Sequence, residues 1–282
     1  MNEKYFDQLQ TEVSLRNLTA STGKTYQGYL KSFLEQTGIN ADEITMDNVR
    51  SFLITKKTSG TSAASLNLYN SAIRFFVRRV LHKQWDWELV PRMKVDRKLP
   101  VILTQEEIQR IMDITKNLKH KAMIATMYSS GLRVSELCQL HYCDISRSNM
   151  HIHVRHTKSR MDRYAVLSER NLEILTAYWY QCGKPRNILF PSSQTGNYID
   201  KNSIAQMIKR IALQAGIYKK VSCHTFRHSF ACHMLESGVD KTYIQILLGH
   251  LDPRSTQVYL HMTNKAFMGI KSPFDNFGGA HE

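Results

Sequence analysis

Five side chains in the second half of the chain could together break a phosphodiester bond. They are two arginines, two histidines and one tyrosine: Arg133, His224, Arg227, His250 and Tyr259. Guanidinium groups bind phosphate oxygens in a bidentate way, and imidazoles transfer protons near neutral pH. A tyrosine hydroxyl can act as the nucleophile once its proton is removed. The set therefore predicts nucleophilic attack on a phosphate, with Tyr259 forming the covalent bond.

Each of these residues, taken alone, has a second interpretation. Arg133 follows a glycine near an expected helix start, where backbone N–H groups favour anions, and Glu136 three residues later could hold its guanidinium. The same pattern fits an ordinary surface arginine with a weak ion pair. Tyr259 alone would fit a buried core residue. The order of the five residues along the chain is what favours a shared site.

Thiols and imidazoles also gather between positions 223 and 233, which raises the alternative of a metal site. The five potential ligands are Cys223, His224, His228, Cys232 and His233. Three of them recur every four residues, as zinc ligands on one helix could. The sequence has no paired C-x-x-C motif there and no second ligand group at finger spacing. We therefore expect no metal and no other cofactor, and we interpret His228 and His233 as core or surface histidines.

The elements that position these residues fall into two domains. Residues 1–88 have the apolar spacing of helices, and we expect a helical domain there. We expect three helices in it. The first is capped by Ser21 or Thr22 and ends at Gly38, the second covers 45–56, and the third covers 63–82. Residues 89–102 contain two prolines and several basic residues, which predicts a basic linker without helix.

A second domain is expected over residues 103–265, followed by a tail over 266–282. Thr104 and Glu107 have the spacing of a capping box. Helices are expected over 104–116, 119–130 and about 133–140. Alternating residues over 151–155 and 163–167 predict a β-hairpin with a basic tip, and the rest reads as helix. The fold class is therefore mainly α with a small antiparallel sheet, that is, an α+β second domain.

The composition points to a polyanionic partner. The net charge is +14 and the sequence pI is about 9.6, which favours nucleic acid first and an anionic membrane surface second. A basic surface that only contacts water is the remaining alternative. No apolar run is long enough to span a membrane, and five cysteines without framework spacing fit reduced cytosolic thiols. The candidate DNA contacts are Lys56, Lys57, Arg74, Arg78, Arg92, Lys94, Arg97, Lys98 and Arg160.

Four motifs in order resemble those of the tyrosine recombinase (phage integrase-like) family. They are Gly131-Leu132-Arg133, His224-x-x-Arg227, Leu247-Leu248-Gly249-His250, and Tyr259. The resemblance covers nearly the whole chain, and its length and layout are most similar to Xer recombinases and integron integrases. It implies a helical core-binding domain and a catalytic domain that close on DNA as a C-shaped clamp.

The resemblance also implies a role for each residue. Arg133 and Arg227 would neutralise the phosphate, His224 would be the general base, and His250 would donate a hydrogen bond to the phosphate. The family's hairpin lysine, which protonates the 5′ oxygen, falls on Lys158. This chain has Thr157 and Ser159 where the family usually has glycines, so a lysine that only contacts a phosphate is the alternative.

The implied function is site-specific recombination through a covalent 3′-phosphotyrosine, in integration, excision, resolution or transposition. The implied partners are double-stranded DNA with inverted-repeat core sites and further copies of the chain, two on one site and four in the synapse. The tail would dock on a neighbouring protomer or else pack on its own domain. A bacterial cytoplasmic location follows, on the nucleoid when bound. A type IB topoisomerase, a telomere-resolving enzyme and an inactive DNA-binding relative are the alternatives.

Overall fold

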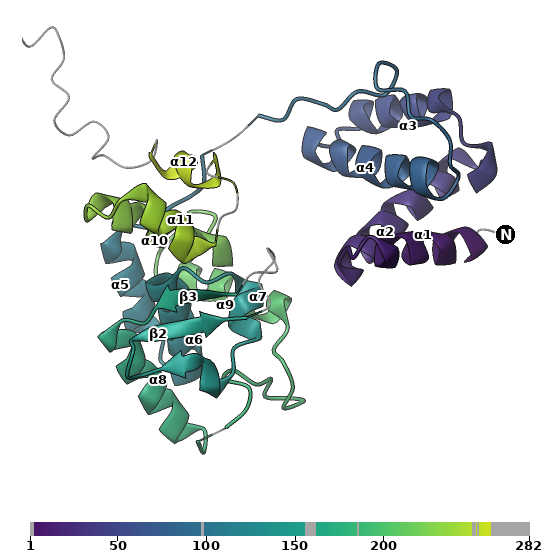
Figure 1. Ribbon diagram of the computed structural model, residues 1–282. Coiled ribbons are helices and arrows are strands. Elements are labelled where there is room, and N and C mark those ends of the chain that lie inside the picture. The colour runs from purple at the N-terminus through teal and green to yellow at the C-terminus, as the bar shows by residue number, and fades with distance from the viewer. Residues whose placement is uncertain are drawn as a thin grey trace, which may run out of the picture. The chain divides into compact units, whose positions relative to one another are not determined.

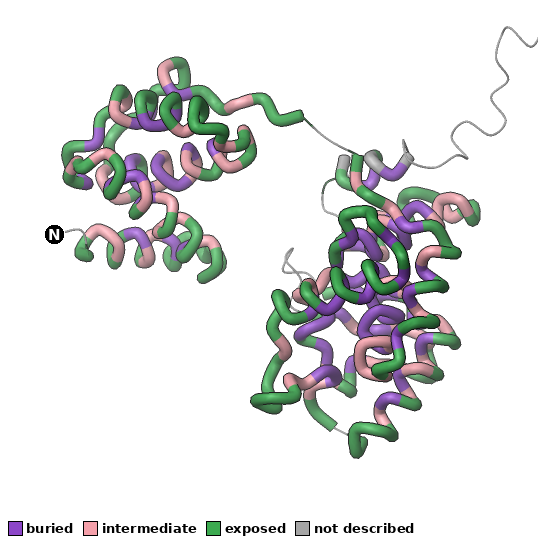
Figure 2. The backbone as a smooth tube through the Cα atoms, turned by 180° about the vertical axis from the view of Figure 1, so that it is seen from behind, coloured by how far each residue is buried: buried purple, intermediate pink, exposed green. Residues whose placement is uncertain are grey.

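The computed structural model of the 282-residue chain describes residues 3–96, 99–155, 162–184, 186–249, 252 and 254–260. By its internal contacts the chain divides into two units, Met1–Lys98 and Leu99–Glu282. Each unit has buried residues along the inner faces of its own elements (Figure 2). The two units therefore have separate cores, and each is described by itself.

The first unit is a small helical bundle. Its elements are α1 (Glu3–Leu15), α2 (Ala20–Thr37), the 3-10 turn η1 (Ala41–Glu43), α3 (Met46–Thr58) and α4 (Ala63–Arg79) (Figure 1). Helix α4 packs against α1, α2 and α3, and aromatic rings fill the space between them. Phe33 and Phe76 are fully buried there. The predicted helical character of this region is confirmed.

The start of α2 differs from the sequence prediction, whereas its end agrees. Thr19 is the N-cap, with an extended backbone and its hydroxyl accepting a hydrogen bond from the backbone N–H of Thr22 at 3.2 Å. The prediction of a cap at Ser21 or Thr22 was wrong, because both already lie within the first helical turn. Gly38 ends the helix with a left-handed φ of +67°, which a glycine adopts without strain.

The second unit combines helices with a three-stranded antiparallel sheet (Figure 1). Its elements are α5 (Gln105–Ile114), α6 (Leu118–Ser130), α7 (Val134–Cys138), η2 (Tyr142–Asp144), β1 (Ile145–Ser146), β2 (His151–Val154), β3 (Arg163–Val166), α8 (Glu169–Gln181), α9 (Lys201–Gln214), α10 (Cys223–Glu236), α11 (Lys241–Leu248) and α12 (Arg254–Leu260). The predicted hairpin is confirmed, with Val154 opposite Arg163. Strand β1 was not predicted, because two residues are too few to show alternation.

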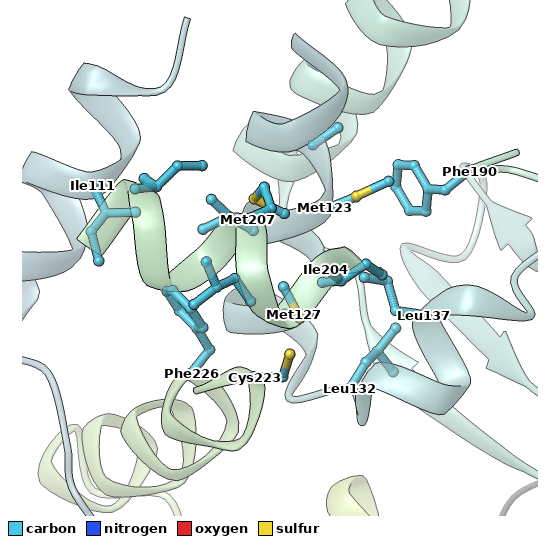
Figure 3. Close-up of a cluster of buried hydrophobic side chains, with 14 of the residues drawn as sticks. Ile111, Met123, Met127, Leu132, Leu137, Phe190, Ile204, Met207, Cys223 and Phe226 are labelled. Atoms are coloured by element: carbon cyan, nitrogen blue, oxygen red, sulfur yellow. The ribbon is translucent and has the colours of Figure 1, made fainter. Parts of the chain in front are cut away.

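The core of the second unit anchors the residues next to the candidate site. Side chains from α5, α6, α7, α9 and α10 converge in it (Figure 3). Leu132 and Phe226 are fully buried, and each directly precedes an arginine, Arg133 and Arg227 respectively. Burial of an apolar neighbour fixes the backbone from which each guanidinium projects.

Helices α10, α11 and α12 lie together at one end of the second unit (Figure 1). They share a smaller apolar cluster made of Phe230, Ala231, Cys232, Ile244, Leu248 and Tyr259. This packing brings Tyr259 from the last described helix against α10, which carries two of the other predicted site residues. Across the described helices, none combines the length and the hydropathy that crossing a bilayer requires.

Candidate active site

A buried carboxylate, Glu136, organises the arginines of the site. One of its oxygens accepts a hydrogen bond from Arg133 Nη1 at 2.8 Å. The other accepts from the Arg133 backbone N–H at 2.8 Å, which caps α7, and from Arg163 Nη2 at 3.0 Å. Arg227 Nη1 lies 4.0 Å from that second oxygen. Three guanidiniums around one carboxylate leave a local surplus of positive charge, as an anion site needs.

Arg227 is the most tightly held of the three guanidiniums. Its Nη1 donates to the carbonyl of Gly131 at 2.7 Å and its Nη2 donates to the carbonyl of Leu248 at 2.5 Å. The residue is buried, and burial lowers its pKa to about 10, with the Arg133 charge adding to the effect. Arg227 therefore stays protonated near neutral pH. Its two hydrogen bonds also connect α10 to the end of α6 and to α11.

Arg163 is a third arginine at the site that the sequence prediction did not include. It begins β3, is buried, and its Nε and Nη1 have no hydrogen-bond partner in the part of the chain that the structure describes. Burial lowers its pKa, whereas Glu136 opposes that shift. A side chain on Gly249, whose φ is +63°, would come within 2.8 Å of Arg163 Cδ. Arg163 therefore occupies the space that this glycine leaves open.

The alternation in the hairpin could have revealed Arg163. The buried positions of β3 are Arg163 and Ala165, and Leu167 continues the same face. An arginine on the inward face of a strand needs a buried acidic partner.

The tyrosine lies against a histidine of α10. Tyr259 is 2 % exposed, and its hydroxyl is 3.0 Å from His228 Nδ1. Burial raises the pKa of Tyr259, while the charges of Arg227 and Arg133 act in the opposite direction. Both guanidiniums therefore lie close enough to influence the phenol. Tyr259 also shares an apolar cluster with Leu248, whose carbonyl accepts a hydrogen bond from Arg227.

His228 was interpreted from the sequence as a core or surface histidine, and that interpretation missed its contact with Tyr259. Burial lowers the pKa of His228 to about 4, with His224 and Arg227 contributing further, so its ring is neutral near pH 7. The rings of His224 and His228 are 6.3 Å apart on the same face of α10. Their four-residue spacing, considered only for a metal, was the signal that could have found this contact.

The thiols of α10 bear on the metal alternative. Burial raises the pKa of Cys232 to about 12, so this thiol is protonated in the protein as it stands. Cys223 is also buried, and its pKa is raised for the same reason. Over the ranges that the structure describes, no three His, Cys, Asp or Glu side chains form a group that could hold an ion.

Several predicted residues fall outside the described part of the chain, namely Lys158, Arg160, His250, Arg97 and Lys98. The other candidate DNA contacts belong to the first unit. Lys57, Arg92 and Lys94 line a hollow of about 540 Å³, together with Arg50. Arg78 is exposed on α4.

Two further basic residues of the first unit lie over aromatic rings. Lys56 Nζ is 5.7 Å from the centre of the Phe52 ring. The Arg74 guanidinium is 4.7 Å from the centre of the Trp87 ring. Such cation–π contacts restrict the two side chains while leaving their charges in place.

Two family models account for most of the chain. Residues 102–266 match the model of the phage integrase family, and residues 5–87 match that of the phage integrase N-terminal SAM-like domain. The chain is 33% identical to the tyrosine recombinase XerD of Oceanobacillus iheyensis, over 93% of this chain and 93% of the relative. Similarity therefore extends through both units.

Solved structures share the fold at lower identity. The XerH site-specific recombinase, bound to a palindromic difH substrate after cleavage, matches with a TM-score of 0.75 at 22% identity, over 96% of this chain and 85% of that one. A lambda integrase dimer bound to a core site matches with a TM-score of 0.73 at 17% identity, over 91% of this chain and 94% of that one. With both units matched by family models and a third of its residues identical to those of XerD, the chain belongs to the phage integrase family of tyrosine recombinases.

Proposed function

We propose that this protein is a site-specific DNA recombinase that cuts and rejoins strands through a covalent bond between Tyr259 and a 3′ phosphate. The observation that carries the proposal is that Tyr259 shares a buried cluster with Leu248, whose carbonyl is bonded to the Arg227 guanidinium, while the Tyr259 hydroxyl contacts the residue after Arg227 at 3.0 Å. A buried nucleophile beside fixed cations suits attack on a phosphodiester, because the negative charge that develops meets donors already in place.

The proposed reaction assigns one task to each group. The Tyr259 oxygen forms a bond to phosphorus, the bond from phosphorus to the 5′ oxygen breaks, and a 3′-phosphotyrosine and a 5′ hydroxyl result. His224 takes the phenol proton, and Lys158 gives a proton to the departing oxygen. Arg133, Arg227 and His250 hold the non-bridging oxygens. Removing one such donor typically costs about 3–4 kcal/mol in the barrier.

The partner in this proposal is double-stranded DNA with inverted-repeat core sites. Support comes from the net charge of +14 and from relatives whose solved structures contain DNA, one of them a dimer on a core site. In the proposal, a core-binding domain over 1–88 and a catalytic domain over 103–265 close on the duplex as a clamp. The linker over 89–102 lies along the phosphates. The basic hollow lined by Lys57, Arg92 and Lys94 suits a phosphate backbone.

Assembly and location belong to the same proposal. Two protomers occupy one site, four act in the synapse, and the tail over 266–282 docks on a neighbour. The protein works in the bacterial cytoplasm, on the nucleoid when bound. The transfer that follows cleavage serves integration, excision, resolution or transposition.

The test begins by finding the DNA. Duplexes retained by the protein from a random-sequence pool are sequenced, resynthesised with a nick near the inferred cleavage point, and incubated with the protein. We expect a covalent adduct that resists denaturant and that Tyr259→Phe abolishes while still binding the duplex. Binding without any adduct would instead favour an inactive DNA-binding relative.

A plasmid assay separates recombination from topoisomerase chemistry. A plasmid with two selected sites should yield recombinants, whereas relaxation of a one-site plasmid without exchange would favour a type IB topoisomerase. A hairpin-ended product would favour a telomere-resolving enzyme.

A further inference from the structure

We propose that His228 is a positioning residue for the nucleophile: its ring accepts a hydrogen bond from the Tyr259 hydroxyl and holds the phenol in place for attack. The inference rests on the proposed function and adds a residue to it. The sequence motifs assign a role to His224 and to Arg227 in this helix, whereas they assign none to His228.

The helix that carries His228 is held by contacts with its neighbours. It directly follows Arg227, whose guanidinium donates to the carbonyls of Gly131 and Leu248. Its helix, α10, packs against both α11 and α12. The backbone of His228 is therefore held relative to the same groups that bind the Arg227 guanidinium. A hydroxyl bonded to this ring is placed relative to both.

The surroundings of the phenol make this polar contact important. Tyr259 packs in the apolar cluster with Phe230, Ile244 and Leu248, where apolar contacts set the depth of the ring but not the direction of its hydroxyl. A hydrogen bond of 3.0 Å to Nδ1 supplies that direction. The geometry requires the His228 proton to reside on Nε2 when Nδ1 accepts.

Proton affinity distinguishes positioning from base catalysis. The pKa of His228 is lowered to about 4, first by burial and then by His224 and Arg227. An ordinary phenol has a pKa near 10, so transfer of its proton to this ring would be uphill by about six powers of ten. His228 therefore orients the hydroxyl before reaction, and the phenol proton passes to the proposed base His224 once the hydrogen bond to His228 breaks.

The experiment compares two amides of similar polarity at position 228. His228→Asn places its side-chain oxygen close to where Nδ1 lies, whereas His228→Gln carries its oxygen one carbon further out. Single-turnover adduct formation is measured on the selected nicked duplex, together with the affinity for that duplex. We expect the Asn variant to cleave within a few-fold of the natural protein. The Gln variant should cleave roughly 10- to 100-fold more slowly at unchanged affinity, because misplacement of a reacting group by about 1 Å has that effect.

A matched control loses an imidazole elsewhere on the same helix. His233→Asn removes the ring that contacts the Tyr128 hydroxyl at 2.9 Å, and cleavage should be unchanged. Equal rates for the Asn and Gln variants of His228 would overturn the inference, whether both are fast or both are slow.

A second measurement needs no DNA. Tetranitromethane modifies accessible tyrosines. After reaction of the full-length chain, mass spectrometry of its proteolytic peptides reports the rate at Tyr259. The Gln variant should be modified faster there than the Asn variant, with Tyr218, which is 87 % exposed, as the internal standard. If the natural protein forms no adduct, the proposed function fails, yet this comparison still tests the position of the phenol. Equal modification rates would refute the role of His228.

Discussion

Replacing Glu136 by glutamine tests whether one carboxylate holds the arginines of the site. The change keeps the shape of the side chain and removes its negative charge. The carboxylate accepts three hydrogen bonds at 2.8, 2.8 and 3.0 Å, two from guanidiniums and one from the Arg133 backbone. Glutamine has one acceptor oxygen, and its amide hydrogens would face guanidinium donors.

The expected loss of stability follows from these contacts. Hydrogen bonds to charged groups contribute about 1.5–3 kcal/mol each, and breaking a buried ion pair typically costs about 3–5 kcal/mol. At least one of the three bonds is lost, and the buried Arg163 then faces a neutral amide in place of a carboxylate. We expect a loss of about 4 kcal/mol. For a unit of this size that corresponds to a fall of roughly 10 °C in the melting temperature.

Calorimetry of the full-length protein measures this change. The transition of the second unit should move, whereas that of the first unit should stay in place. Glu173→Gln, an exposed glutamate on α8, is the control and should shift neither transition. A Glu136→Gln protein that melts within about 1 °C of the natural one, a shift below about 0.5 kcal/mol, would show that the carboxylate does not hold the guanidiniums.

Four further outcomes follow from the structure. Gly131→Ala should destabilise the second unit by about 2–4 kcal/mol in urea denaturation, because the φ is +60° and the new Cβ would lie 2.6 Å from Phe230 Cδ1. Gly28 lies in α2, and a Cβ added there would have no neighbouring atom within 4 Å. Gly28→Ala should therefore stabilise the first unit by about 0.5–1 kcal/mol, and a loss of stability in both glycine variants would contradict the steric reasoning. Arg227→Lys should slow adduct formation by about 100-fold or more with little change in binding, since lysine lacks the fork that reaches two carbonyls. Because the pKa of His228 is about 4 in the folded protein and near 6.5 unfolded, the unfolded chain binds more protons between these values. The free energy of unfolding should therefore fall as pH drops through that window. The urea midpoint of His228→Asn should depend less on pH than that of the natural protein, and an equal pH dependence of the two would refute this.

Local signals in the sequence predicted much of the fold. The capping box of Thr104 and Glu107 is present, with the hydroxyl and the carboxylate each bonded to the other's backbone. Gly38 ends α2, and the hairpin strands pair as their alternation predicted. These features depend on residues a few positions apart, so their spacing carries the information. The cap of α2 was misplaced because several adjacent hydroxyls compete for that role.

The interior of the site could be predicted only in part. The contact between Arg163 and Glu136 spans 27 residues, and that between Arg227 and the Gly131 carbonyl spans 96. Such contacts depend on how α7, β3 and α10 pack, which no spacing along the chain encodes. His228 shows the same limit: a histidine one turn after His224 fits a metal ligand, a core residue or a partner of the tyrosine equally well.

The close fit between Arg163 and Gly249 constrains the design of chimeric recombinases of this kind. The aliphatic part of the arginine fills the volume that a methyl group at position 249 would need. A hairpin grafted from another recombinase would therefore have to fit against Gly249 as Arg163 does. The two residues form one packing unit, although 86 positions separate them in the sequence, from 163 to 249.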